Sequence, residues 1–167
     1  LLQDYQINVL CCTPTEYRMM AKLSNLNDYH LELLHSAVSA GEPLNREVVE
    51  QFKNNFNLTV RDGYGQTEST LLIGFLKDTE PRPGSMGKGI PGSFVTIIDD
   101  DGNEVPPQTK GNIAVPLDLP ALFKGYYKDE ERTKAAAAGY YYVTGDLAHK
   151  DEDGYFWFEG RRDDIII

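Results

Sequence analysis

Cysteine is nearly absent from this sequence. The 167 residues contain 2 cysteines, the neighbours Cys11 and Cys12. Neither has another cysteine or a histidine at metal-ligand spacing, which argues against a disulfide framework and a structural zinc site. We therefore expect reduced thiols in a reducing compartment, the cytoplasm. His30, His35 and His149 have no partner pattern either, and we expect structural or exposed roles for them.

Positive charge and long apolar runs are also scarce. Lys and Arg total 16 against 26 Asp and Glu, which gives a formal net charge of −10. A surface with this charge and no basic cluster repels a phosphate backbone, so nucleic acid is not an expected partner. No apolar run approaches the roughly 20 residues of a membrane helix, and we expect no membrane span.

Apolar patterning predicts a layered α/β part over residues 1–77. Alternation near residues 5–11 predicts a strand, and Thr13, Pro14 and Glu16 are typical of a helix start. A second helix is expected from Pro43, followed by a strand at 58–60. Met19 and Met20 extend the first helix, where they either line a pocket or pack in the core. Strand, helix and strand with short connections indicate an α/β layer.

The remaining residues predict a β-rich part. Residues 80–92 hold three prolines and four glycines, so we expect a loop over 78–93. Over 94–163, strands are expected at residues 94–98, 111–115, 140–143, 147–149 and 155–158, forming a small twisted sheet or distorted barrel. Residues 99–103 suit a hairpin turn better than a calcium loop. The four alanines at 135–138 are expected to form a helical connector.

The segment DGYGQTES at residues 62–69 combines glycines with three kinds of polar side chain. Glycines at 63 and 65 allow backbone conformations closed to other residues and a close approach of N–H groups to a ligand. Gln66, Thr67 and Glu68 then supply an amide, a hydroxyl and a carboxylate. Such groups suit a phosphate and its divalent cation. A glycine turn capped by Thr67 is the simpler alternative.

Four motifs in order resemble one family. GYGQTE at 63–68 resembles the central adenylate-binding motif of the AMP-forming acyl-CoA synthetases, the adenylate-forming ligases. Segments 39–44 (SAGEPL), 142–146 (YVTGD) and 153–164 (DGYFWFEGRRDD) match further motifs of that family in its order. The resemblance covers nearly the whole chain and is closest to the large amino-terminal domain of short- and medium-chain acyl-CoA synthetases. That domain would stop here at the hinge to the carboxyl-terminal domain, with residues 164–167 beginning the hinge segment.

The resemblance implies a two-step reaction. A carboxylic acid attacks the α-phosphate of ATP to give acyl-AMP and pyrophosphate, and a thiol such as coenzyme A then takes the acyl group. Charge repulsion between carboxylate and triphosphate makes Mg²⁺ an expected cofactor. Thr67 and Glu68 would be the catalytic residues: Thr67 would bind the α-phosphate and Glu68 would bind the metal.

The resemblance also implies a nucleotide site. Tyr64 would lie flat on adenine, and Asp62 would accept from the adenine amino group or cap the next turn. Asp146 would take both ribose hydroxyls or cap a turn, with Arg161 completing the ribose contact. Asp163 matches the family's hinge, and Arg162 is expected to be solvated. The expected nucleotide-binding set is Gly41, Glu42, Pro43, Asp62, Gly63, Tyr64, Gly65, Gln66, Thr67, Asp146, Phe158 and Arg161.

The resemblance leaves two family segments unmatched. The phosphate loop would lie upstream of Leu1 and the small domain beyond Ile167, so we expect this chain alone to keep a nucleotide pocket but little or no ligase activity. An amino-acid-activating domain would place an Asp near residues 10–18, where the chain offers only Glu16. A non-catalytic nucleotide-binding or interaction fragment is the other alternative. The acyl chain length, the thiol acceptor and self-association into a homo-oligomer stay open.

Overall fold

A computed structural model describes residues 1–164, in which the strands join one sheet. The strands are β1 (Val9–Cys12), β2 (Ser36–Ala40), β3 (Val60–Gln66), β4 (Thr70–Gly74), β5 (Gly87–Gly89), β6 (Thr96–Ile98), β7 (Gly111–Pro116), β8 (Ala137–Ala138), β9 (Tyr141–Lys150) and β10 (Tyr155–Arg161). The helices are α1 (Pro14–Ala21), α2 (Arg46–Phe56) and α3 (Glu130–Ala135), with 3₁₀ turns at Leu26–Asp28 and Arg162–Asp164. The sheet order is β1-β2-β3-β4-β5-β10-β9-β7-β6, and β8 pairs with β9 outside that path.

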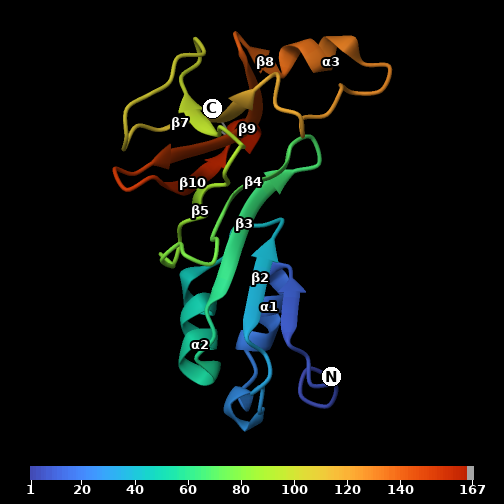
Figure 1. The fold of residues 1–167 in the computed structure, drawn as a ribbon, viewed down its shortest axis with the longest axis vertical. Coiled ribbons are helices and arrows are strands. Elements are labelled where there is room, and N and C mark those ends of the chain that lie inside the picture. Colours follow the sequence, from blue (N-terminus) through green and yellow to red (C-terminus); the bar gives the residue numbers. More distant parts are fainter. Residues whose placement is uncertain (165–167) are drawn as a thin grey trace.

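The first part of the chain is the expected α/β layer (Figure 1). Strands β1, β2 and β3 are parallel, and α1 and α2 pack against them in one apolar cluster. Tyr17 and Phe52 meet edge-to-face at the centre of this cluster, with ring centroids 5.2 Å apart. The predicted helix start is confirmed, because Thr13 and Glu16 form a capping box at α1.

Two local predictions are wrong at their boundaries. Helix α2 begins at Arg46 rather than at Pro43, because Asn45 takes the extended N-cap conformation. Residues 41–45 therefore stay outside the helix as a loop. The first strand forms only over Val9–Cys12, where β2 is alongside to pair with it, and residues 2–6 make turns instead.

The central glycine segment is not the glycine turn that was the simpler alternative. Residues 60–66 form β3, which pairs with β2 on one side and β4 on the other. Gly63 and Gly65 do not have left-handed φ angles. Gly65 is required for another reason: a Cβ atom there would lie 1.9 Å from the carbonyl oxygen of Thr70 on β4. The turn follows β3 at residues 67–69, where Ser69 N–H donates to the Gln66 carbonyl at 3.1 Å.

Strands β5, β10, β9, β7 and β6 form the antiparallel part. The two strands expected at 140–143 and 147–149 are parts of a single strand, β9, which contains a left-handed Gly145 and pairs irregularly with β7. The expected loop at 78–93 contains β5, which pairs with β4 and β10 and so joins the two parts. The alanine run is only partly helical, because Ala135 ends α3 and Ala137–Ala138 form β8.

The expected turn at 99–103 is confirmed, since Asp99 Oδ1 accepts from the N–H groups of Asp101 and Asn103 at 3.0 and 2.8 Å.

Figure 1 shows β3 and β4 running from the α/β part into the antiparallel part. None of the helices in the described part of the chain has the length and apolar character needed to cross a bilayer.

The close approach at Gly65 predicts a sharp positional effect. Gly65→Ala should lower the free energy of unfolding by about 3 kcal/mol, because its Cβ collides with backbone rather than with a movable side chain. Gly74→Ala, on the paired strand, is the control: its Cβ would meet its nearest atom at 3.5 Å, an ordinary contact. Urea denaturation of both variants checks this. Equal losses would contradict the account.

Candidate functional site

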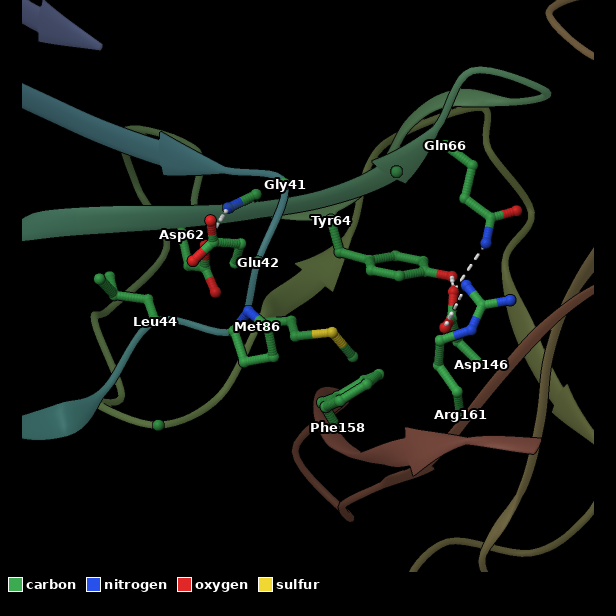
Figure 2. Close-up of a pocket in the computed structure, with 14 residues that line it drawn as sticks. Gly41, Glu42, Leu44, Asp62, Tyr64, Gln66, Met86, Asp146, Phe158 and Arg161 are labelled. Atoms are coloured by element: carbon green, nitrogen blue, oxygen red, sulfur yellow. Dashed lines mark hydrogen bonds and ion pairs between the residues drawn. The ribbon is translucent and has the colours of Figure 1, made fainter. Parts of the chain in front are cut away.

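A cavity of about 330 Å³ lies where the α/β part meets the antiparallel part. It is lined by every expected nucleotide-binding residue except Thr67 (Figure 2). Leu44, Gly84 and Met86 also line it and were missed from the sequence. Gly84 and Met86 belong to the segment expected to be a loop. They reach the cavity because β5 pairs with β4 and β10, a long-range pairing that local sequence does not show.

Asp146 forms one end of the cavity. Its carboxylate is only 4% exposed, and its Oδ2 accepts from the Tyr64 hydroxyl at 2.6 Å and from Gln66 Nε2 at 2.7 Å. Arg161 Nη1 lies 3.5 Å from Oδ1. Burial raises the pKa of Tyr64, and the bond to Asp146 raises it further, so this hydroxyl stays a donor. Since each carboxylate oxygen can accept two hydrogen bonds, Oδ1 can still receive ribose hydroxyls.

Asp62 marks the opposite end in Figure 2. Burial raises the pKa of this carboxyl to about 7, although the N–H groups of Gly63 and Leu44 partly oppose the shift. Gly63 N–H donates to Asp62 Oδ1 at 3.0 Å. Near neutral pH the group exists in both protonation states, so it can offer an acceptor alone or a donor beside an acceptor.

The wall between the two acidic ends is apolar. In Figure 2 the ring of Tyr64 lies across the cavity from Met86 and Phe158. The flat face of Tyr64 suits a planar base, and Met86 and Phe158 complete the apolar wall. The cavity thus combines an apolar middle with hydrogen-bonding groups at each end.

The loop at 41–43 is attached to α1 through Glu42. The Glu42 carboxylate accepts from Thr15 Oγ1 at 2.7 Å and from Arg18 Nη2 at 2.8 Å. These two bonds, first that of Thr15 and then that of Arg18, lower the pKa of Glu42. The loop therefore offers mainly its backbone and Pro43 to the cavity, with Gly41 in the left-handed region at φ 98°. Thr15 and Arg18 were missed, since nothing local in the sequence pairs them with Glu42.

Thr67 and Glu68 lie on the β3–β4 turn, outside the residues that line the cavity. Thr67 is exposed, and Glu68 Oε1 accepts from the Tyr126 hydroxyl at 2.9 Å. Within residues 1–164 no cluster of three His, Cys, Asp or Glu side chains could hold a metal ion. One half-buried carboxylate nevertheless fits Mg²⁺, which often takes one or two carboxylates and fills its shell with water and substrate phosphate.

Asp163 lies in the 3₁₀ turn after β10, where its carboxylate accepts from Arg161 Nη2 at 3.1 Å. Residue 164 is the last described position, so the rest of the expected hinge segment lies outside the described residues. Arg162 is exposed, as expected, and its Nη1 lies 3.0 Å from Asp100 Oδ1. His149 Nδ1 contacts Glu159 at 2.5 Å on the sheet, away from the residues that line the cavity.

Met19 and Met20 differ in burial. Met19 is 68% exposed, whereas Met20 packs against the apolar cluster of the α/β part. Both line a separate, mostly apolar cavity of about 520 Å³ beside β1, α1 and α2. Packing in the core, one of the two roles expected for these methionines, therefore applies to Met20 and not to Met19.

Comparison with known proteins identifies the family. A family model described as AMP-binding enzyme matches residues 1–127. The chain belongs to this family. The match confirms the resemblance to AMP-forming acyl-CoA synthetases that the four sequence motifs indicated.

Individual relatives agree with the family match. The chain is 63% identical over its whole length to an uncharacterized acyl-CoA ligase of Bacillus subtilis, YtcI, and covers 32% of that protein. It is 43% identical, over 99% of its length, to the mitochondrial acyl-coenzyme A synthetase ACSM3 of Rattus norvegicus and covers 29% of it. The chain thus spans about a third of the curated relatives it matches.

Solved structures show the same fold. The anthranilate CoA ligase AuaEII in complex with anthranoyl-AMP superposes with a TM-score of 0.89 at 28% identity, with 99% of this chain and 32% of that one covered. ATP-bound MatB from Rhodopseudomonas palustris gives a TM-score of 0.89 at 28% identity, with 99% and 33% covered. These matches confirm the predicted fold class.

The pKa of Asp62 predicts how stability depends on pH. The folded chain holds this proton up to about pH 7, whereas an unfolded Asp loses it near its ordinary pKa of 3.8. The contribution of Asp62 to the free energy of unfolding is therefore fully present below about pH 4. It is lost as pH rises through 7, and the loss is at most about 4 kcal/mol. Asp62→Asn should remove this decline in urea denaturations between pH 4 and 8. Asp78→Asn, at an exposed position, should keep the parent's slope; parallel pH slopes for the parent and Asp62→Asn would contradict the assignment.

Proposed function

We propose that this chain carries the adenylate-binding part of an ATP-dependent acyl-CoA ligase. The observation that carries the proposal is the buried Asp146 carboxylate at one end of a cavity whose other end holds Asp62. The apolar middle and the hydrogen-bonding ends of this cavity suit a nucleoside, with the base in the middle near Asp62 and the ribose at Asp146. The acid is proposed to be a short- or medium-chain carboxylic acid, in line with the motifs and with relatives named as acyl-coenzyme A synthetases.

In this proposal each residue binds one part of the nucleotide. The ring of Tyr64 and the backbone of residues 41–43 hold the two faces of adenine, and Asp62 accepts from its amino group. Asp146 accepts the ribose hydroxyls, while Arg161 donates beside it. Gln66 keeps Asp146 in place, because its amide donates to Oδ2 and to the Thr144 carbonyl at 3.0 Å.

The phosphates are proposed to lie beyond Gln66, toward the β3–β4 turn. Thr67 would donate its hydroxyl to the α-phosphate, and Glu68 would hold Mg²⁺. When bound, the metal would neutralise triphosphate charge as the acid's carboxylate oxygen attacks the α-phosphorus and pyrophosphate leaves. In the second step the sulfur of coenzyme A attacks the acyl carbonyl, and AMP leaves with the electrons of the broken acyl–oxygen bond.

We further propose that Asp163 marks a hinge, consistent with its place in a short turn directly after β10.

The solved relative bound to anthranoyl-AMP supports an adenylate ligand for this fold. Because the chain spans about a third of its relatives, a nucleotide-binding piece with little or no ligase turnover is the second candidate for the isolated chain. A reducing compartment, the cytoplasm, is proposed from the free thiols of Cys11 and Cys12.

Ligand binding tests the proposal. The parent chain should bind a non-hydrolysable acyl-AMP analogue saturably in calorimetric titration. Asp146→Asn should weaken binding at least about 10-fold, because hydrogen bonds to a charged group are typically worth about 1.5–3 kcal/mol. Asp78→Asn serves as the control, since that side chain is exposed, and should bind like the parent.

The contradicting result is also specific. If Asp146→Asn keeps its circular-dichroism melt and binds the analogue as tightly as the parent, Asp146 does not hold the ribose. Robust acyl-CoA formation by the purified parent chain would favour a complete ligase over the nucleotide-binding piece.

A further inference from the structure

Glu68 is held at two points by a segment far along the chain. Its backbone carbonyl accepts from Phe123 N–H at 2.7 Å, and its side-chain Oε1 accepts from the Tyr126 hydroxyl at 2.9 Å. Both donors belong to the connection between β7 and α3, which crosses to the tip of the β3–β4 hairpin (Figure 1). One neighbouring segment thus restrains both the backbone and the side chain of Glu68, the residue that the proposed function assigns to Mg²⁺.

Tyr126 is itself fixed from several sides. Its N–H donates to Thr133 Oγ1 at 2.9 Å, and its ring lies edge-on to Phe123 with centroids 4.9 Å apart. The guanidinium of Arg132 covers the ring at 3.9 Å from its centroid. Asp129 accepts from Arg132 N–H at 3.0 Å and caps α3, which fixes the start of the helix that carries Arg132. These contacts hold the ring in the position from which its hydroxyl donates to Glu68.

The same aromatic group reaches the ribose end of the cavity. Phe123 also packs edge-on against Tyr142, with ring centroids 5.5 Å apart. The Tyr142 hydroxyl in turn donates to Gln66 Oε1 at 3.1 Å, and Gln66 donates to Asp146. One packed cluster thereby sets the positions of both carboxylates.

The electrostatics suit a fixed donor. Burial raises the pKa of Tyr126, and the hydrogen bond to Glu68 raises it further, so the hydroxyl remains protonated at neutral pH. A bond at Oε1 restrains the plane of the carboxylate, while Oε2 keeps its capacity to bind a cation. Mg²⁺ demands near-ideal octahedral geometry, so a restrained carboxylate presents a better ligand than a mobile one.

We propose that Tyr126, backed by Arg132, is a positioning residue that orients Glu68 for the metal of Mg²⁺–ATP. The inference rests on the proposed role of Glu68. Tyr126 acts through Glu68 and not on the reacting atoms. Its loss should therefore weaken only the part of nucleotide binding that depends on the metal.

Calorimetric titration of three chains tests this: the parent, Tyr126→Phe and Tyr127→Phe. Tyr126→Phe keeps the packed ring and removes the hydroxyl, whereas Tyr127, the matched control, is 87% exposed. Titration with AMP reports the base and ribose contacts, which need neither Glu68 nor the metal. Titration with ATP, with and without Mg²⁺, gives the gain in affinity due to the metal.

We expect all three chains to bind AMP equally. The gain from Mg²⁺ should fall at least about 10-fold in Tyr126→Phe, since a hydrogen bond that orients a charged metal ligand is lost, and stay unchanged in Tyr127→Phe. A purely structural role would instead lower AMP affinity and the melting temperature. An undiminished gain from Mg²⁺ in Tyr126→Phe would overturn the inference, whereas failure of the parent to bind AMP would count against the proposed function.

A second measurement needs no nucleotide. In the parent, the Glu68 carboxylate helps to raise the pKa of Tyr126. Glu68→Gln should therefore lower the pKa of Tyr126. This pKa can be measured by NMR of tyrosine labelled with carbon-13 at the ring carbon that carries the hydroxyl. An unchanged pKa would show that Tyr126 does not hold Glu68 in solution and would overturn the inference whether or not the chain binds nucleotide.

Discussion

The buried Asp146 carboxylate is the constraint on which the site depends. A charge that is only 4% exposed is costly unless it is paired and hydrogen-bonded, and the partners of Asp146 come from two other strands. Tyr64 and Gln66 extend from β3, and Arg161 extends from β10. Satisfying one carboxylate thus ties the α/β part to the antiparallel part. The cavity forms at that junction, so the stability of the junction and the shape of the site have a common origin.

Backbone departures from local expectation also contribute to the cavity. Residues 43–45 would lengthen α2 if the helix began at Pro43, but the extended Asn45 leaves residues 41–45 as a loop beside Asp62. Glu42 then fastens that loop to α1. Because β3 is a strand and not a turn, alternate side chains Asp62, Tyr64 and Gln66 share one face and line the cavity together. The alternation of side chains along β3 therefore orders the site, although the β3–β4 pairing is irregular between Tyr64 and Gly65.

The sequence predicted what local chemistry determines. Thr13, Pro14 and Glu16 signal the start of α1 because a cap involves only neighbours. The motifs predicted nearly all the residues that line the cavity, since the family resemblance carried three-dimensional information that the residue pattern alone lacked. The constraint that requires glycine at position 65, the Thr70 carbonyl, could not be predicted because it lies on the partner strand. Met86 and the Tyr126–Glu68 contact were missed for the same reason, as both depend on pairings between distant segments.

In the proposed function one nucleoside occupies the cavity from Asp62 to Asp146. Amide NMR of the chain during titration with AMP tests this placement. Saturable shifts are expected at Gly41 and Gly63, near the base, and at Gly145 and Asp146, near the ribose, with a single dissociation constant for both groups. Shifts confined to one end, or gathered around the separate apolar cavity beside α1, would contradict it.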